Sequence, residues 1–163
     1  MTVPGRVLSS GTVPSTTFRP VGRRHWLFPA GLMVFAALWL VFFPRTFTIV
    51  DEDAYLTQAL LLRHGRLTYE ESGIPAPHMT VEQAGRLASK YPPGNSLLLL
   101  PFTLLGWRGA FLLGLVLALL GTWLFRRVLA VIEPGADPAW SLLYLFYPTV
   151  VLYSRTLMSD LAA

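Results

Sequence analysis

WLFPAGLMVFAALWLVFFP, residues 26–44, is an apolar run without a single charged side chain. As an α-helix it would be about 28 Å long, close to the roughly 30 Å of hydrocarbon in a bilayer. The alternative is a cleaved signal peptide, whose apolar region is shorter and ends in small residues of the A-x-A kind. This run instead ends in two phenylalanines, Pro44 and Arg45. The stretch therefore favours a retained membrane anchor.

The composition supports the same fold class. Hydrophobic residues make up 53% of the chain, charged residues only 13%, and the mean hydropathy is +0.52. Because the apolar residues stand in long blocks, we expect an all-α integral membrane protein. The chain has no cysteine, which excludes disulfides, thiol catalysis and thiolate metal sites. Its three histidines fall in no metal-binding spacing such as H-E-x-x-H.

The formal charge of +4 does not indicate a nucleic-acid partner. Four arginines stand in an acid-free segment, residues 1–25, which is rich in Gly, Pro, Ser and Thr. We interpret this segment as a disordered, basic cytoplasmic tail. Positive charge before an apolar span places the N-terminus in the cytoplasm, so the loop of residues 45–95 is predicted to face outward.

The outer loop begins with a helical pattern over residues 51–64. Its apolar side carries Tyr55, Leu56, Ala59, Leu60 and Leu62, and Gln58 and Arg63 are assigned to the opposing side. Gly65 follows where a helix C-cap belongs. We expect a juxtamembrane helix on the outer surface, whereas Pro75 and Pro77 argue against any regular element in residues 66–89.

Two further spans are predicted, over residues 109–125 and 140–153. Residues 96–105 are apolar but too short to cross alone, and Pro101 interrupts them. If they are re-entrant or joined to the next helix, Arg126 and Arg127 lie in the cytoplasm, as the positive-inside rule prefers. The third span then returns outward and places Asp160 on the same face as the outer loop. The abrupt end at Ala163 indicates the N-terminal part of a larger polytopic bundle, residues 26–163.

Three acids open the outer helix: Asp51, Glu52 and Asp53. One interpretation is ordinary helix capping, with an N-cap Asp and acids in the first turn. Another is that a carboxylate takes a proton from an acceptor hydroxyl. Acid clusters also bind divalent cations, so a metal held by these three residues is a further possibility and the cofactor is left open.

Lys90 stands directly before Tyr91-Pro-Pro-Gly, a turn at which the chain returns to the membrane. A lysine here could meet a lipid phosphate, and it could equally be a snorkelling interfacial residue. Asp160 could likewise be a plain solvated residue. Tyr91 and the other aromatic residues near span ends are most simply an interfacial belt.

Together these pieces resemble a known family. The order is a first span, then D-E-x-x-Y with Tyr55, then K-Y-P-P-G, then L-M-S-D ending at Asp160. It is similar to the N-terminal part of the C-superfamily membrane glycosyltransferases, and most of all to family 39, the protein O-mannosyltransferases and lipid A aminoarabinose transferases. The resemblance covers residues 26–163. The third acid, Asp53, departs from the pattern and leaves open which carboxylate is the base.

The resemblance implies an inverting transfer of sugar from a polyprenyl-phosphate carrier to a lipid, glycan or protein acceptor outside the cell membrane. Asp51 and Glu52 would serve as base or orient the acceptor, and Asp160 would join them. Lys90, with Tyr55 and Tyr91, would bind the substrate and its phosphate. Family members have more spans and an outer domain, so this chain alone is expected to be inactive. The alternative is a non-enzymatic transporter or envelope assembly factor whose acids only cap a helix; it is disfavoured because the predicted spans carry no internal charge.

Overall fold

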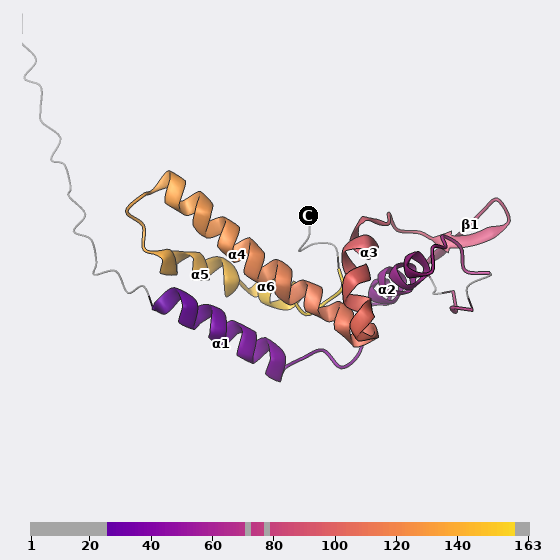
Figure 1. The fold of residues 1–163 in the computed structure, drawn as a ribbon, viewed down its shortest axis with the longest axis horizontal. Coiled ribbons are helices and arrows are strands. Elements are labelled where there is room, and N and C mark those ends of the chain that lie inside the picture. Colours follow the sequence, from indigo (N-terminus) through magenta and orange to yellow (C-terminus); the bar gives the residue numbers. More distant parts are fainter. Residues whose placement is uncertain (1–25, 71–72, 77–78, 159–163) are drawn as a thin grey trace, which may run out of the picture.

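The computed structural model describes residues 26–70, 73–76 and 79–158. The described chain is mostly helical and elongated (Figure 1). The elements are α1 (Leu27–Val41), α2 (Val50–Arg63), β1 (Thr80–Gln83), β2 (Arg86–Ser89), α3 (Gly94–Leu99), η1 (Leu100–Leu105), η2 (Trp107–Phe111), α4 (Leu112–Ile132), η3 (Pro138–Ser141), α5 (Leu142–Leu145) and α6 (Pro148–Tyr153).

Helix α4 is the longest element. Its 21 residues extend about 31 Å, and η2 leads directly into it, so that Trp107–Ile132 forms one apolar helical stretch. Within the described residues this is the one helix long and apolar enough to cross a membrane. Only 11% of its most apolar window is buried inside the structure, whereas the core helix of a soluble protein is mostly buried. Its apolar surface is therefore left facing outward.

The helix extends beyond the predicted boundary at residue 125. Arg126 and Arg127 lie within its last two turns instead of after its end. Both guanidinium groups lie over aromatic rings, Arg126 over Phe28 at 4.6 Å and Arg127 over Trp123 at 5.0 Å. Long arginine stems can cover apolar surface while their charged heads reach toward water. This explains how the helix continues through two charges.

The other two predicted spans are shorter than the sequence suggested. α1 has 15 residues, about 22 Å, because it ends before Phe42 and Pro44. Residues 140–153 do not form one helix, since η3, α5 and α6 follow one another with a break at Tyr147. Pro148 lacks an N–H and disfavours helical dihedrals in the residue before it, and Tyr147 is accordingly extended at φ −62° and ψ 130°.

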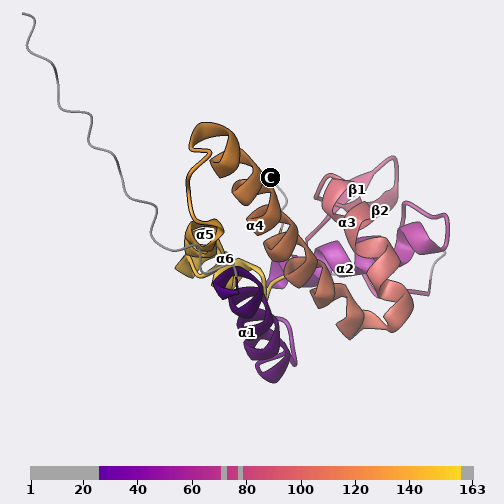
Figure 2. The same ribbon diagram turned by 60° about the vertical axis from the view of Figure 1, so that its left-hand side comes forward.

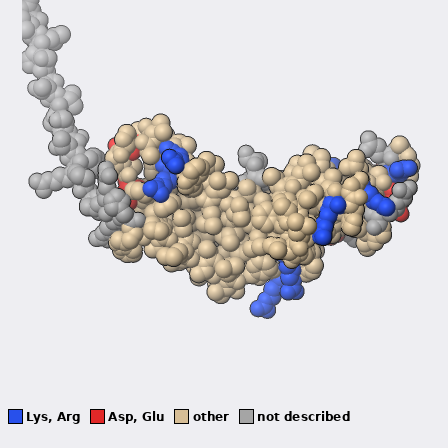
Figure 3. Space-filling model, viewed as in Figure 1, with Lys and Arg blue, Asp and Glu red and all other residues tan. Residues whose placement is uncertain are grey.

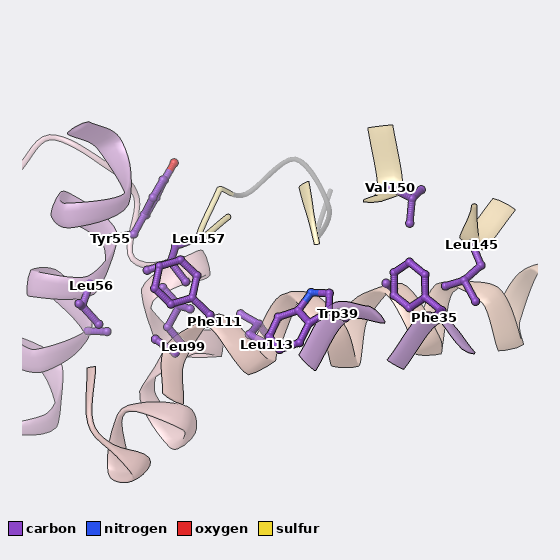
Figure 4. Close-up of a cluster of buried hydrophobic side chains, with 13 residues drawn as sticks. Phe35, Trp39, Tyr55, Leu56, Leu99, Phe111, Leu113, Leu145, Val150 and Leu157 are labelled. Carbon is purple, nitrogen blue, oxygen red and sulfur yellow. The ribbon is translucent and has the colours of Figure 1, made fainter. Parts of the chain in front are cut away.

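The helices α1, α4, α5 and α6 pack side by side (Figures 1 and 2). The indole of Trp39 donates to the carbonyl oxygen of Ser154 at 2.9 Å, which joins α1 to the end of α6. α4 approaches the same peptide through Gly114, where an added Cβ would lie 2.2 Å from the Ser154 oxygen. The buried side chains continue along the molecule from Leu145 to Leu56, so one apolar core connects the long helices to α2 (Figure 4).

The prediction of a helix opening the outer loop is confirmed. α2 ends in a Schellman motif: Arg66 N–H donates to the Leu61 carbonyl, and Gly65 N–H donates to that of Leu62. Gly65 has a φ of +67°, a conformation that glycine adopts at little cost. Gln58, assigned to the polar outer side, faces α3 instead, as its hydrogen bonds below show.

The prediction of no regular element in residues 66–89 is wrong, because one small hairpin forms there. The described chain is otherwise mostly helical, as expected. β1 and β2 form an antiparallel hairpin in which Gln83 pairs with Arg86. Ala84 and Gly85 connect them, with φ values of 52° and 75°, as in a two-residue type I′ turn. The hairpin lies beside α2 at the end of the molecule away from α1 (Figure 2).

Candidate active site

The three acids at the start of α2 point to three different environments. Ile49 is the N-cap residue, so Asp51 is not the N-cap that the capping interpretation supposed. Successive residues on a helix are rotated by about 100° about its axis. Adjacent carboxylates in this turn therefore cannot converge, and each has its own role.

Glu52 is the capping residue. Its side chain is fully buried, and its Oε2 accepts hydrogen bonds from the backbone N–H groups of Thr48 and Ile49. Its Oε1 accepts a third, at 3.0 Å, from the backbone N–H of Leu157. Buried carboxylates need such partners, and these three leave no oxygen directed at solvent. Glu52 thus joins the start of α2 to the segment after α6, and the geometry does not support its prediction as a second catalytic acid.

Asp51 is only partly buried and faces the turn that follows β2. The hydroxyl of Tyr91 is the group on which this carboxylate acts. Hydrogen bonding to Asp51, desolvation and the negative charge of Asp51 together raise the pKa of Tyr91 to about 12. Asp51 therefore favours the protonated phenol of Tyr91.

The predicted substrate-binding residues gather at the same place. The rings of Tyr55 and Tyr91 are 4.8 Å apart between centroids and inclined by 34°. The Lys90 ammonium lies 5.9 Å from the centre of the Tyr91 ring, and its side chain is exposed. A carboxylate, an exposed cation and two phenol rings therefore meet where α2 begins and the K-Y-P-P-G turn passes it.

Asp53 belongs to a different neighbourhood. Its charge acts on Tyr69, whose pKa is raised mainly by burial and to a smaller extent by Asp53. A hydrogen bond between the Tyr69 and Thr57 hydroxyls partly offsets this rise. The predicted metal site of the three acids is therefore not formed, because the side chains diverge. Within the part of the chain that the structure describes, no group of three His, Cys, Asp or Glu residues is placed to hold a metal ion.

Three polar residues that the sequence analysis missed complete the site. Gln58 donates from Nε2 to the carbonyl oxygen of Tyr91 at 3.0 Å, and its Oε1 accepts from the Ser96 hydroxyl at 2.6 Å. Asn95 donates to the carbonyl oxygen of Leu157 at 2.7 Å. The spacing of Asp51, Tyr55 and Gln58 at i, i+4 and i+7 was the available signal for one common helix face.

The last predicted site residue, Asp160, lies outside the described residues. The chain leading to it is well anchored, since the Leu157 peptide is bound on one side by Glu52 and on the other by Asn95.

Comparison of the chain with family models, with curated proteins and with solved structures finds no match.

Proposed function

We propose that this chain forms part of an inverting membrane glycosyltransferase that uses a polyprenyl-phosphate sugar on the extracytoplasmic face. The observation that carries the proposal is the meeting of Asp51, Lys90 and Tyr91 at one end of an otherwise apolar helix assembly. The carboxylate is accessible and is not used for capping, because Glu52 does that. The proposal also rests on the order of D-E-x-x-Y, K-Y-P-P-G and L-M-S-D in the sequence.

The chemistry requires two complementary charges. An acceptor hydroxyl oxygen attacks the anomeric carbon, a new C–O bond forms, and the bond from that carbon to the carrier phosphate breaks. Asp51 takes the hydroxyl proton, and the leaving phosphate keeps the bonding electron pair. Lys90 stabilises the charge that grows on this phosphate. Tyr91, whose hydroxyl interacts with Asp51, orients the carboxylate.

A membrane location is part of the same proposal. On the face shown in Figure 3, Lys and Arg side chains lie toward the two ends of the molecule, with one group on its lower edge, and uncharged surface covers most of the middle. α1 and α4 run in opposite directions, so Phe28 and Arg126 lie at one end while α2 lies at the other (Figure 1). In the proposed arrangement, residues 1–25 and 126–138 are cytoplasmic, and residues 45–95 and 155–163 are outside. The short α1 and the broken α5–α6 segment would be the first and third of three spans.

Single cysteines test the topology, because the natural chain has none. Cysteines at Ser72 and Ser159 should react with an impermeant thiol reagent added outside intact cells, and a cysteine at Ser10 should not. Labelling of position 10 without position 72 would reverse the proposed orientation.

Asp51→Asn tests the chemistry in the full-length protein, meaning this chain with any residues that follow it. Transfer from a polyprenyl-phosphate sugar should fall by about a hundredfold or more, because Asn cannot accept a proton. Lys90→Ala should both weaken carrier binding and slow transfer. The control is Asp53→Asn, which removes an adjacent acid outside the site. Equal rates for wild type and Asp51→Asn at equal membrane abundance would eliminate Asp51 as the base.

The non-enzymatic alternative draws support from one observation, the capping role of Glu52. It predicts that the full-length protein transfers no sugar from a polyprenyl-phosphate donor, in wild type and in Asp51→Asn alike. The same transfer measurement therefore decides between the two functions.

A further inference from the structure

Gln58 is a residue to which the sequence analysis assigned no functional role. It belongs to a stripe on α2 that also contains Asp51 and Tyr55. All three contact a single residue of the following turn, Tyr91, and each contacts a different part of it.

The three residues of α2 interact with the hydroxyl, the ring and the backbone of Tyr91. The Asp51 carboxylate acts on the phenol hydroxyl and favours its protonated form. Tyr55 packs against the ring, with centroids 4.8 Å apart. Gln58 donates to the carbonyl oxygen at 3.0 Å. Since the spacing is i, i+4 and i+7, the three side chains extend over two turns of one helix face.

Gln58 is itself fixed by a second hydrogen bond. Its Oε1 accepts from the hydroxyl of Ser96, which is fully buried at the start of α3 and also lies 3.0 Å from the carbonyl oxygen of Tyr55. The amide therefore has a defined orientation: the oxygen faces α3 and the nitrogen faces the Tyr91 carbonyl. A side chain whose two ends are both used cannot rotate without losing a partner.

We infer that Gln58 is a positioning residue, which holds the backbone of the K-Y-P-P-G turn on α2 and thereby sets Tyr91, with Lys90 over its ring, beside Asp51. Gln58 touches no reacting atom. It acts on Tyr91, and through Tyr91 on the carboxylate and on the neighbouring ammonium. The effect of Gln58 on catalysis rests on the proposed function, whereas its effect on the position of Tyr91 does not.

The structural test uses the 163-residue chain in detergent micelles, with ¹³C-labelled tyrosine and with Tyr91 assigned from Tyr91→Phe. Gln58→Met keeps the length of the side chain and removes both hydrogen bonds. We expect weaker nuclear Overhauser contacts between the rings of Tyr55 and Tyr91 at pH 7. The titration midpoint of Tyr91 should also move from about 12 toward the ordinary value of 10.0, because its hydroxyl no longer stays against Asp51.

Two companion variants sharpen this result. Ser96→Ala removes the partner that orients Gln58 but leaves the amide, so its effect should lie between wild type and Gln58→Met. Thr122→Val is the stability control, because it removes a buried hydrogen bond to the Ala118 carbonyl on α4, remote in sequence from the site. It should leave both Tyr91 signals unchanged. Tyr91 signals that stay as in wild type in Gln58→Met would overturn the inference.

The catalytic test uses the full-length protein. Gln58→Met should lower kcat for sugar transfer about ten- to a hundredfold, the scale expected when reacting groups are misplaced by about an ångström. The pH profile should keep its shape, since the base is intact, and Thr122→Val should retain wild-type kcat at equal abundance. Release of Tyr91 with unchanged kcat would overturn the catalytic half of the inference. Absence of transfer in wild type would instead refute the proposed function, and the Tyr91 signals would still decide the positioning role.

Discussion

Glu52→Gln should destabilise the fold strongly, although it changes one oxygen to an NH2 group. The carboxylate accepts three backbone N–H groups in a fully buried site, two through Oε2 and one through Oε1. Glutamine can keep its oxygen toward Thr48 and Ile49, but its NH2 group then faces the N–H of Leu157. A hydrogen bond to a charged group contributes about 1.5–3 kcal/mol, and an unsatisfied buried donor costs about 1–3 kcal/mol. We therefore expect the free energy of unfolding to fall by about 2–4 kcal/mol.

The assay is reversible unfolding of the chain in mixed micelles with increasing sodium dodecyl sulfate, followed by circular dichroism. The matched control is Asp51→Asn, the same chemical change in the neighbouring residue. Asp51 is partly exposed and caps nothing, so this variant should lose less than about 0.5 kcal/mol, as surface substitutions usually do. If the two variants lost equal stability, or if Glu52→Gln lost none, the division of roles between the two acids would be refuted.

Three further results are expected. In Asp51→Asn, ¹³C-tyrosine spectra should show the pKa of Tyr91 falling from about 12 toward 10.0, because the acceptor charge that favours the protonated phenol is removed; an unchanged midpoint would contradict the Asp51–Tyr91 contact. Gly114→Ala should lower the thermal midpoint by several degrees, because its Cβ would lie 2.2 Å from a backbone oxygen, whereas Gly94→Ala, with open space around it, should not. The pKa of Glu70 is lowered mainly by the hydrogen bond from the backbone N–H of Leu87, so this hydrogen bond should persist above pH 4.5 and be lost as the pH falls through the lowered pKa. The amide signal of Leu87 should therefore titrate in wild type and stop titrating in Glu70→Gln. An amide signal that does not change with pH in wild type would refute the contact.

The sequence was most informative where the structure follows local rules. The apolar periodicity and Gly65 predicted α2 within a residue of its observed ends. The hairpin was not predicted, although Pro75 and Pro77 argue against regular structure only near themselves and both precede β1, which begins at Thr80. Two features were usable signals: the alternation of residues 79–82, and Gly85 in the turn, because a two-residue turn with positive φ values favours glycine. Pro148 likewise predicts a break at Tyr147 in the apolar segment of residues 140–153, because the residue before a proline disfavours helical dihedrals.

The candidate site was predictable in part. D-E-x-x-Y and K-Y-P-P-G identified Asp51, Tyr55, Lys90 and Tyr91, which the structure brings together. The role of Gln58 was not predictable from hydrophobic periodicity. That method assigns a polar residue to the solvent side, whereas here the partner is another polar segment. Only the positions of the turn and of α3 reveal that the amide is enclosed.

The adjacent acids Asp51 and Glu52 stand in the same helical turn but have different partners. Neighbouring side chains on a helix diverge by about 100°, so if one acid points into the core, the next acid points in a different direction. Glu52 points inward, where its charge is balanced by three N–H donors and where it anchors the Leu157 peptide. Asp51 is thereby released from capping and directed at Tyr91. A site that needs an available carboxylate at a helix start gains from a second acid beside it, since the second one satisfies the helix end and leaves the first free to exchange a proton.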